Sequence, residues 1–168
     1  MTHTLVLVRH ARAESLASSD AERALTPRGH AEGRAAGAWL ATAGVVPGRA
    51  LVSDALRARE TWADLAAAAG WGLDAEYDAA LYSADTESAL DLVRATDDGI
   101  GTLVVVGHNP TMASLVHMID DGDGADGTEV LRHGFPSGSA AVFEIDVRWD
   151  ELELSSARLV GFRPGEPA

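Results

Sequence analysis

The 168-residue sequence contains no cysteine, no lysine and no long apolar run. The lack of cysteine excludes disulfide bonds, thiolate catalysis and cysteine-ligated zinc sites. No apolar stretch approaches the roughly 20 residues that a membrane-spanning helix needs, so we expect no membrane partner. The short apolar stretch at the N-terminus has neither a basic leader nor a cleavage site, which argues against a signal peptide. These absences make the cytoplasm the default expected location.

Positive charge is also scarce. Thirteen arginines are outnumbered by 26 acidic residues, which gives a net charge of −13. A surface this acidic repels nucleic acid and anionic membranes, so we expect neither as a partner. Biased codon usage is the simplest explanation for the exclusive use of arginine. An arginine buried in a pocket of an acidic protein is nevertheless of interest, because its guanidinium binds phosphate or carboxylate through a fork of hydrogen bonds.

Apolar runs alternate with helical patterns along the chain. Strands are predicted over residues 4–8, 50–53, 73–77, 102–106, 140–147 and 152–159. Helices are predicted over residues 27–44, 54–70 and 86–94 and from residue 110 onward. Such alternation predicts a parallel sheet with helices on both faces. We therefore expect an α/β fold with three α/β/α layers and a mostly parallel central sheet, and the length suggests a single domain over residues 1–168.

The predicted helices carry recognisable start signals. Thr26 and Pro27 are typical of an N-cap followed by proline at the first helical position. Asp54 is expected to cap the second helix in a similar way. The inward face of the first helix is expected to carry Ala31, Ala35, Ala38 and Trp39.

Arginine and histidine side chains follow three of the predicted strands. Arg9 and His10 come directly after the first strand. Arg57 lies in the first turn of the helix after the second strand, and His108 follows the fourth strand. Because parallel sheets bind ligands beyond the carboxyl ends of their strands, we expect these four side chains to converge in one pocket. Such a pocket is an anion site that suits phosphate, and the helix that begins at Pro110 adds partial positive charge.

The motifs around these residues resemble those of the histidine phosphatase superfamily, in the phosphoglycerate mutase-like branch. The first strand reads LVLVRHA, which is similar to the family's strand-Arg-His-Gly signature. The stretches SDALRARET, VVVGHNP and LTPRG resemble, in turn, the second arginine segment, the second catalytic histidine segment and the entry into the first long helix. Ala11 stands where the family usually has glycine. Because alanine is also small, we expect only a modest effect on how closely the backbone approaches the phosphate. The short length and simple layout are most similar to SixA-type phosphohistidine phosphatases.

This resemblance implies a phosphoglycerate mutase-like fold and a phosphatase that hydrolyses a phosphomonoester or a phosphoramidate, protein phosphohistidine included. It makes His10 the nucleophile, which becomes a phosphohistidine. Arg9, Arg57 and His108 are implied to hold the phosphoryl oxygens and to stabilise the transition state. Physical chemistry agrees, because phosphoryl transfer depends mainly on positioning and electrostatics. No metal and no cofactor is then required, and the partner is a phosphorylated small molecule or a phosphohistidine protein.

A second pair, Arg132-His133, is followed by glycine and matches the family triplet more closely than Arg9-His10 does. Only residues 129–131 precede it, too few for a buried central strand, and residues 135–138 are typical of a turn. We therefore reject this pair as the nucleophile, although its loop could border the pocket. Residues 120–127 are similar to a calcium loop but lack key ligands, so we expect a solvated acidic loop. The remaining histidines are expected at the surface: His3, His30 and His117.

The general acid is the least defined part of the expected site. Asp85 and Glu87, after the third strand, are the candidates, and Asp85 is more simply a helix cap. The lack of an obvious proton donor is similar to SixA-type members.

Three alternative functions remain open. A phosphoglycerate mutase-type phosphotransferase is one, although the chain leaves little room for segments that close over the substrate. A non-catalytic phosphate-binding module is another, although binding alone would need only the arginines. The third is a hydrolase with His10 and His108 as metal ligands, for which the sequence offers no completing carboxylate–histidine motif. The sequence does not indicate the physiological substrate, the pathway or the oligomeric state.

Overall fold

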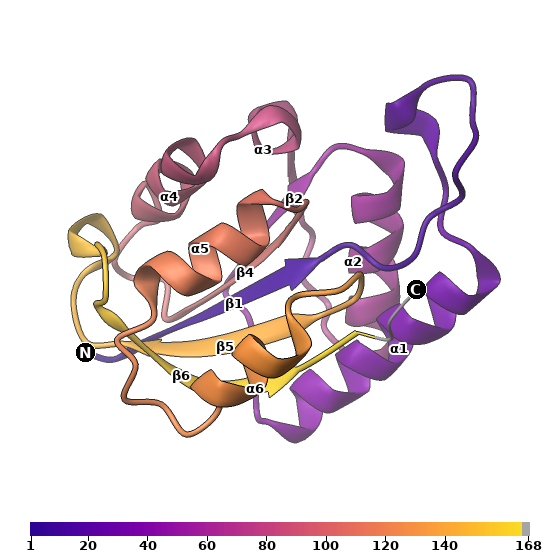
Figure 1. Cartoon of the computed structure of the whole chain (residues 1–168). Helices are drawn as coiled ribbons and strands as arrows, with labels where there is room; N and C mark the ends of the chain where they lie inside the picture. The colour runs from indigo at the N-terminus through magenta and orange to yellow at the C-terminus, as the bar shows by residue number, and fades with distance from the viewer. Residues whose placement is uncertain (166–168) are drawn as a thin grey trace.

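The computed structural model of the chain describes residues 1–165 (Figure 1). Its centre is a six-stranded sheet with the strand order β3-β2-β4-β1-β5-β6. The strands are β1 (His3–Arg9), β2 (Arg49–Ser53), β3 (Glu76–Asp78), β4 (Thr102–Gly107), β5 (Ala140–Ile145) and β6 (Ala157–Arg163). The first four run parallel, whereas β5 pairs antiparallel with β1 and β6 pairs antiparallel with β5. The predicted α/β fold with a mostly parallel sheet is confirmed.

Helices cover both faces of the sheet (Figure 1). One face carries α1 (Pro27–Thr42) and α2 (Leu56–Ala69). The other face carries α3 (Ala79–Ser83), α4 (Thr86–Arg94), α5 (Thr111–Ile119) and α6 (Gly127–His133). Two short 3-10 turns are η1 (Asp20–Glu22) and η2 (Trp149–Glu151). Within residues 1–165 no helix is both long and apolar enough to cross a membrane.

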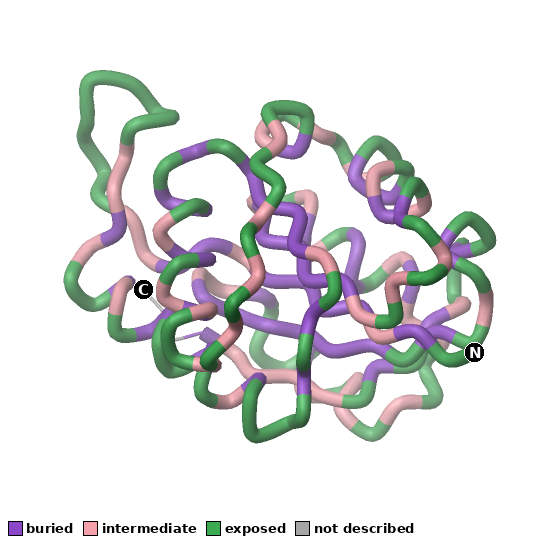
Figure 2. The backbone as a smooth tube through the Cα atoms, turned by 180° about the vertical axis from the view of Figure 1, so that it is seen from behind, coloured by how far each residue is buried: buried purple, intermediate pink, exposed green. Residues whose placement is uncertain are grey.

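The continuous apolar run of β1 explains its central place. Leu5 and Leu7 belong to the core on the α5 side, whereas Val6 and Val8 belong to the core beneath α1 and α2. Successive side chains of a strand point to opposite faces, so a strand buried on both sides must be apolar throughout. Figure 2 shows the buried strands at the centre of the molecule.

The buried face of α1 differs from the predicted one. Ala31, Ala35 and Ala38 are exposed and Trp39 is only partly buried. The helix instead packs through a face that is rich in small residues, Gly33, Ala36, Gly37 and Leu40. A Cβ atom on Gly37 would lie 2.5 Å from the Leu65 carbonyl oxygen in α2, so glycine allows the two helices to approach closely. Apolar periodicity missed this face because glycine contributes no hydrophobic signal.

The helix starts agree only in part with expectation. Thr26 caps α1 as predicted, since its hydroxyl accepts a hydrogen bond from the Gly29 N–H at 2.9 Å. Asp54 does not cap α2, which begins one residue later after Ala55. No side chain caps α2, and the Ala55 N–H, which precedes the helix, donates to the Ser53 hydroxyl at 3.3 Å.

Three further differences concern the edges of the fold. The second closing strand begins at residue 157, not 152, because η2 and a positive φ of 54° at Ser155 interrupt the chain before it. Residues 127–133 form α6, where no helix was predicted. His3 is buried, not at the surface, and its ring nitrogens lie 3.1 Å from the carbonyl oxygens of Val147 and Asp98. These carbonyl groups are distant in sequence, so the sequence alone could not reveal them.

Candidate active site

The four side chains singled out from the sequence lie together in one cleft. The cleft has a volume of about 340 Å³ and lies beyond the carboxyl ends of β1 and β4. Its lining residues are Arg9, His10, Arg12, Ala13, Arg23, Arg57, His108, Asn109 and Ser137. A second hollow of about 310 Å³ contains no titratable side chain and lies between the ends of α1 and α2, around Trp71. Only the first of these two hollows has groups suited to acid, base or nucleophilic chemistry.

His10 directly follows β1, and hydrogen bonds to backbone carbonyl groups fix both its main chain and its ring. Its N–H donates to the Gly107 carbonyl at 3.0 Å, which ties it to the end of β4. The ring Nδ1 lies 2.7 Å from the Ala11 carbonyl oxygen. A carbonyl oxygen can only accept, so Nδ1 carries the ring hydrogen and Nε2 of the neutral ring keeps a free lone pair.

Burial keeps the His10 ring neutral. The side chain is 8% exposed. This burial, together with the positive charges of Arg57 and Arg9, lowers the pKa of His10 to about 3, although the hydrogen bond to Ala11 acts in the opposite direction. A neutral imidazole with a free lone pair is a nucleophile that needs no base.

His108 follows β4 and faces His10, with the two ring centroids 5.2 Å apart. Its Nε2 lies 2.7 Å from the hydroxyl oxygen of Ser53, which is fully buried. Burial and the nearby charge of Arg57 lower the pKa of His108 to about 4. The Ser53 hydroxyl already accepts a hydrogen bond from Ala55 and can donate its own hydrogen to Nε2. In the tautomer that accepts this hydrogen bond at Nε2, the hydrogen of His108 resides on Nδ1.

Arg9 connects the cleft to the loop that follows α6. Its Nη1 donates to the Phe135 carbonyl at 3.3 Å, and the Asn109 side-chain amide donates to the same oxygen at 2.9 Å. Burial lowers the pKa of Arg9. Ser137, two residues further along, lines the cleft. The loop after the rejected Arg-His pair therefore does border the cleft.

Arg57 emerges from the first turn of α2 and is covered by the loop over residues 14–24. Its Nη1 donates to the Asp20 carbonyl at 2.8 Å, and its Nη2 donates to the Asp20 carboxylate at 3.1 Å. The same carboxylate accepts hydrogen bonds from Tyr82 and Arg23. These bonds hold the pKa of Asp20 well below its usual range, with the Tyr82 hydroxyl as the largest cause. Asp20 is therefore an ionised partner of Arg57 at neutral pH.

Two arginines of the cleft were not singled out from the sequence. Arg12 lies two residues after His10 and is partly buried. Arg23 lies at the end of η1, where Nε donates to the Glu14 carbonyl at 2.7 Å and Nη1 donates to Asp20 at 3.0 Å. Proximity to His10 in the sequence could have indicated Arg12. No local pattern indicated Arg23, because its loop reaches the cleft only in the folded chain.

Other candidates lie outside the cleft. Asp85 caps α4 by accepting a hydrogen bond from Ser88 N–H at 2.8 Å, and Glu87 is exposed. Arg132 and His133 are exposed on α6, where each pairs with Glu129 at 3.2 Å. Within the described part of the chain, no three His, Asp or Glu side chains are grouped so that they could hold a metal ion.

The small residue after His10 does not disturb the backbone. Ala11 is fully buried and is not among the described residues with a positive φ. Its N–H donates to the Thr61 hydroxyl at 3.0 Å. An alanine therefore fits where the family usually has glycine.

Comparison with known sequences identifies a family and two relatives. Residues 5–88 match the sequence model of the histidine phosphatase superfamily (branch 1). An uncharacterised protein of Mycobacterium leprae (strain TN) is 34% identical over 145 residues, which are 86% of this chain and 88% of that protein. An uncharacterised protein of Mycobacterium tuberculosis (strain ATCC 25618 / H37Rv) is 34% identical over 146 residues, 86% of this chain and 90% of its own length.

Solved structures show the same similarity. A candidate SixA phosphohistidine phosphatase from Nakamurella multipartitia is 32% identical with a TM-score of 0.85, over 98% of this chain and 97% of that chain. One from Agrobacterium tumefaciens is 30% identical with a TM-score of 0.78, over 96% of this chain and 97% of that chain. The histidine phosphatase SixA in complex with tungstate shares the fold, with 24% identity and a TM-score of 0.78 over 96% of both chains. The chain therefore belongs to branch 1 of the histidine phosphatase superfamily and is a member of the SixA type.

Proposed function

We propose that this chain hydrolyses phosphoramidates, above all phosphohistidine on a protein, through a phosphohistidine intermediate on His10. Family membership supports phosphatase activity in general. One observation carries the assignment of this cleft as a phosphoryl site. Three buried nitrogen atoms, Arg9 Nε, Arg57 Nε and His108 Nδ1, have no hydrogen-bond partner among the described residues. All three belong to side chains that line the same cleft as His10.

Unpartnered buried donors support binding of an anion. A buried N–H without an acceptor costs about 1–3 kcal/mol, so proteins rarely leave several in one place. A phosphoryl group carries three oxygens that accept hydrogen bonds, and charge grows on these oxygens in the transition state. Donors that are already fixed in position stabilise that charge without reorganisation.

The proposed reaction has two displacements. In the first, the lone pair on His10 Nε2 forms a bond to phosphorus, and the bond from phosphorus to the leaving group breaks with its electron pair on the leaving group. In the second, water attacks phosphorus, the N–P bond breaks, and its electron pair returns to Nε2. The water gives up a proton to solvent and inorganic phosphate departs. Two easier steps thus replace one difficult step.

The composition of the cleft supports a phosphoramidate substrate. Among the residues that line it within the described chain, none is a carboxylate. Asp20 lies nearby, but Tyr82, Arg23 and Arg57 hold its pKa low, so it is a poor proton donor. An alkoxide leaving group needs a positioned acid. The ring of phosphohistidine can take a proton from solvent on its other nitrogen, and it then departs as neutral imidazole without an acid from the protein.

A comparison of three substrates tests this proposal. We expect kcat/KM to be highest for a phosphohistidine peptide, lower for an aryl phosphate and lowest for an alkyl phosphate. The same order is expected in Asp85→Asn and Glu87→Gln, because both carboxylates lie outside the cleft. A preference for the alkyl ester that either substitution removes would contradict the proposal, since it would identify a dedicated acid.

A further inference from the structure

The cleft holds more positive charge than one phosphoryl group needs. Four arginines line it, in a chain whose net charge is −13. Arg9 and Arg57 have the unpartnered buried nitrogens that we assign to the phosphoryl oxygens. Arg12 and Arg23 remain at the same cleft without a role in that assignment.

Arg12 differs from most arginines of the chain. At least nine arginines form an ion pair with a carboxylate: Arg23, Arg34, Arg49, Arg57, Arg94, Arg132, Arg148, Arg158 and Arg163. The side chain of Arg12 forms no hydrogen bond, ion pair or ring contact with any of residues 1–165. Acidic residues are twice as numerous as arginines. A partly buried guanidinium that none of them neutralises is therefore available to an anion from outside.

The backbone of Arg12 is fixed in place. Its carbonyl accepts a hydrogen bond from the Thr26 N–H at 3.0 Å, at the start of α1. A Cβ atom on Gly29 would overlap this carbonyl oxygen, so the sequence keeps glycine there. The preceding N–H, on Ala11, donates to the Thr61 hydroxyl of α2. A fixed backbone lowers the ordering cost when the side chain binds a ligand.

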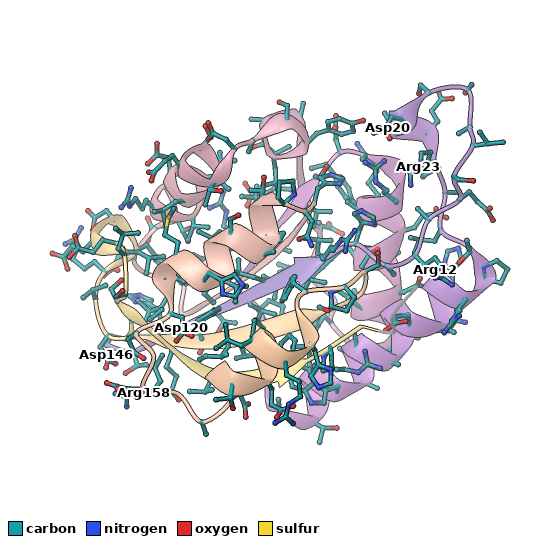
Figure 3. The ribbon with its side chains drawn as sticks, in the orientation of Figure 1. Arg12, Asp20, Arg23, Asp120, Asp146 and Arg158 are labelled. Atoms are coloured by element: carbon teal, nitrogen blue, oxygen red, sulfur yellow. The ribbon has the colours of Figure 1, made fainter. Side chains whose placement is uncertain are left out.

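Arg23 reaches the cleft from the loop over residues 14–24. Its Nε and Nη1 donate to Glu14 and Asp20, and within residues 1–165 its Nη2 donates to no acceptor. Figure 3 shows Arg23 near Asp20, on the same side of the molecule as Arg12. The loop over residues 14–24 extends away from the body of the protein and is largely exposed (Figure 2). A group bound at the cleft mouth can thus contact both guanidinium groups.

We propose that Arg12, assisted by Arg23, binds a second anionic group of the substrate beside the phosphoryl group. This inference rests on the proposed function, and with a phosphohistidine protein as substrate the second anion is an Asp or Glu side chain next to the phosphohistidine. Guanidinium groups bind carboxylates through short, charge-assisted hydrogen bonds. They also offset the repulsion that an acidic surface exerts on an acidic segment. Arg12 is then a specificity-determining residue of the cleft.

The test uses matched phosphohistidine peptides that differ at one position beside the phosphohistidine, with Glu, Gln or Lys there. The readout is the ratio of kcat/KM for the Glu peptide to that for the Gln peptide. We expect a ratio of about 10 to 100 for the native chain, as for one charge-assisted hydrogen bond. We expect about 1 for Arg12→Gln. Arg34→Gln, an exposed arginine of α1 outside the cleft, should keep the native ratio.

Reversing the charge at Arg12 is expected to reverse the peptide preference, which a misfolded variant could not do. Arg12→Glu should prefer the Lys peptide over the Glu peptide. A native ratio near 1, or a high ratio retained in Arg12→Gln, would overturn the proposal. If the native chain cleaved these peptides at equal rates, phosphohistidine hydrolysis would stand and only the second subsite would fail.

A small-molecule pair separates the proposed function from the subsite. Phenyl phosphate and 2-carboxyphenyl phosphate differ only by a carboxylate. If no peptide is cleaved, the proposed protein substrate fails. A preference for the carboxylated ester that Arg12→Gln removes would then support the subsite with a small-molecule source. No preference between the two esters would refute it.

Discussion

At the scale of the residue, His10 is a buried neutral imidazole whose single N–H group is already hydrogen-bonded. Nδ1 donates to the Ala11 carbonyl at 2.7 Å, which leaves Nε2 as the only reactive nitrogen. Desolvation disfavours the charged ring, and the neighbouring arginines add to this effect. The chemistry we propose depends on this neutral state, so its protonation is the first property to measure.

We expect His10 to stay neutral in the free protein down to about pH 3, and His108 down to about pH 4. Both values lie below the ordinary 6.5 of the unfolded chain, so the unfolded state binds more protons between these limits. The stability that the neutral rings contribute is complete above about pH 6.5 and is lost as the pH falls towards the folded values. Imidazole NMR titration, with a urea-unfolded reference, checks this. Protonation of His10 near pH 6.5 in the folded chain would contradict it.

Arg57→Lys is expected to lower kcat/KM by roughly 10- to 1000-fold, the range for loss of one preorganised donor. Lysine keeps the charge but cannot bond the Asp20 carbonyl and carboxylate while a third nitrogen stays free. Steady-state kinetics on an aryl phosphate measure the effect. The control is Arg59→Lys, an exposed neighbour that stacks on Tyr77 outside the cleft. Equal kcat/KM values for the two variants would show that Arg57 does not contact the phosphoryl group.

Sequence patterns indicated some residues of the cleft and not others, for a physical reason. Arg9, His10, Arg57 and His108 lie at or just after the ends of buried strands, and the carboxyl ends of parallel strands meet at one edge. Arg23 comes from an irregular loop, where no periodicity tells a cleft arginine from a surface one.

At the scale of elements, the start of α1 packs against the segment that follows β1. The Arg12 carbonyl accepts from Thr26 N–H, and Gly29 lies against that carbonyl. This contact packs the stretch LTPRG against the chain that follows the Arg-His pair. Glycine is required here for close approach and not for an unusual backbone angle.

Gly29→Ala is expected to destabilise the fold by about 1–3 kcal/mol, the usual cost of overpacking. The added Cβ would overlap the backbone carbonyl of Arg12, which cannot move aside as a flexible side chain can. Urea unfolding measures the change, and activity should fall with it because Arg12 adjoins the cleft. Gly72→Ala is the control, since nothing lies within 4 Å of its ideal Cβ. Equal stability of the two variants would contradict this packing.

Glycine also limited what could be predicted about the elements. The positions of the central strands and the mostly parallel sheet followed from apolar runs, because a parallel sheet buries both faces. The face of α1 that packs against α2 could not be predicted from apolar runs, because Gly33 and Gly37 allow close packing through their lack of a side chain. Similarly, α6 is short and buries only Val130, so its pattern is too weak to detect.

At the scale of the whole molecule, an acidic chain surrounds a basic cleft. Nine residues from separate segments line this cleft, and four of them are arginines. The sheet brings Arg9, His10 and His108 to one edge, and Asp20, in the loop over residues 14–24, accepts hydrogen bonds from Arg57. The positive field is thus built into the fold.

Chelators are expected to leave activity unchanged. Arg9, Arg57 and His108 already offer the donors that a phosphoryl group needs. Turnover of an aryl phosphate after dialysis against EDTA is the measurement. Activity that disappears and returns with zinc or manganese would favour the alternative in which the two histidines hold a metal ion.

Phosphorylation of His10 is the central claim, and rapid quenching after exposure to a phosphoryl donor tests it directly. We predict about one phosphoryl group per chain, stable in base and labile in acid, on His10. His10→Ala should form none and should lose roughly 10³-fold or more in rate, whereas the exposed His133→Ala should behave like the native chain. Label on His133, or undiminished turnover in a folded His10→Ala chain, would contradict the account.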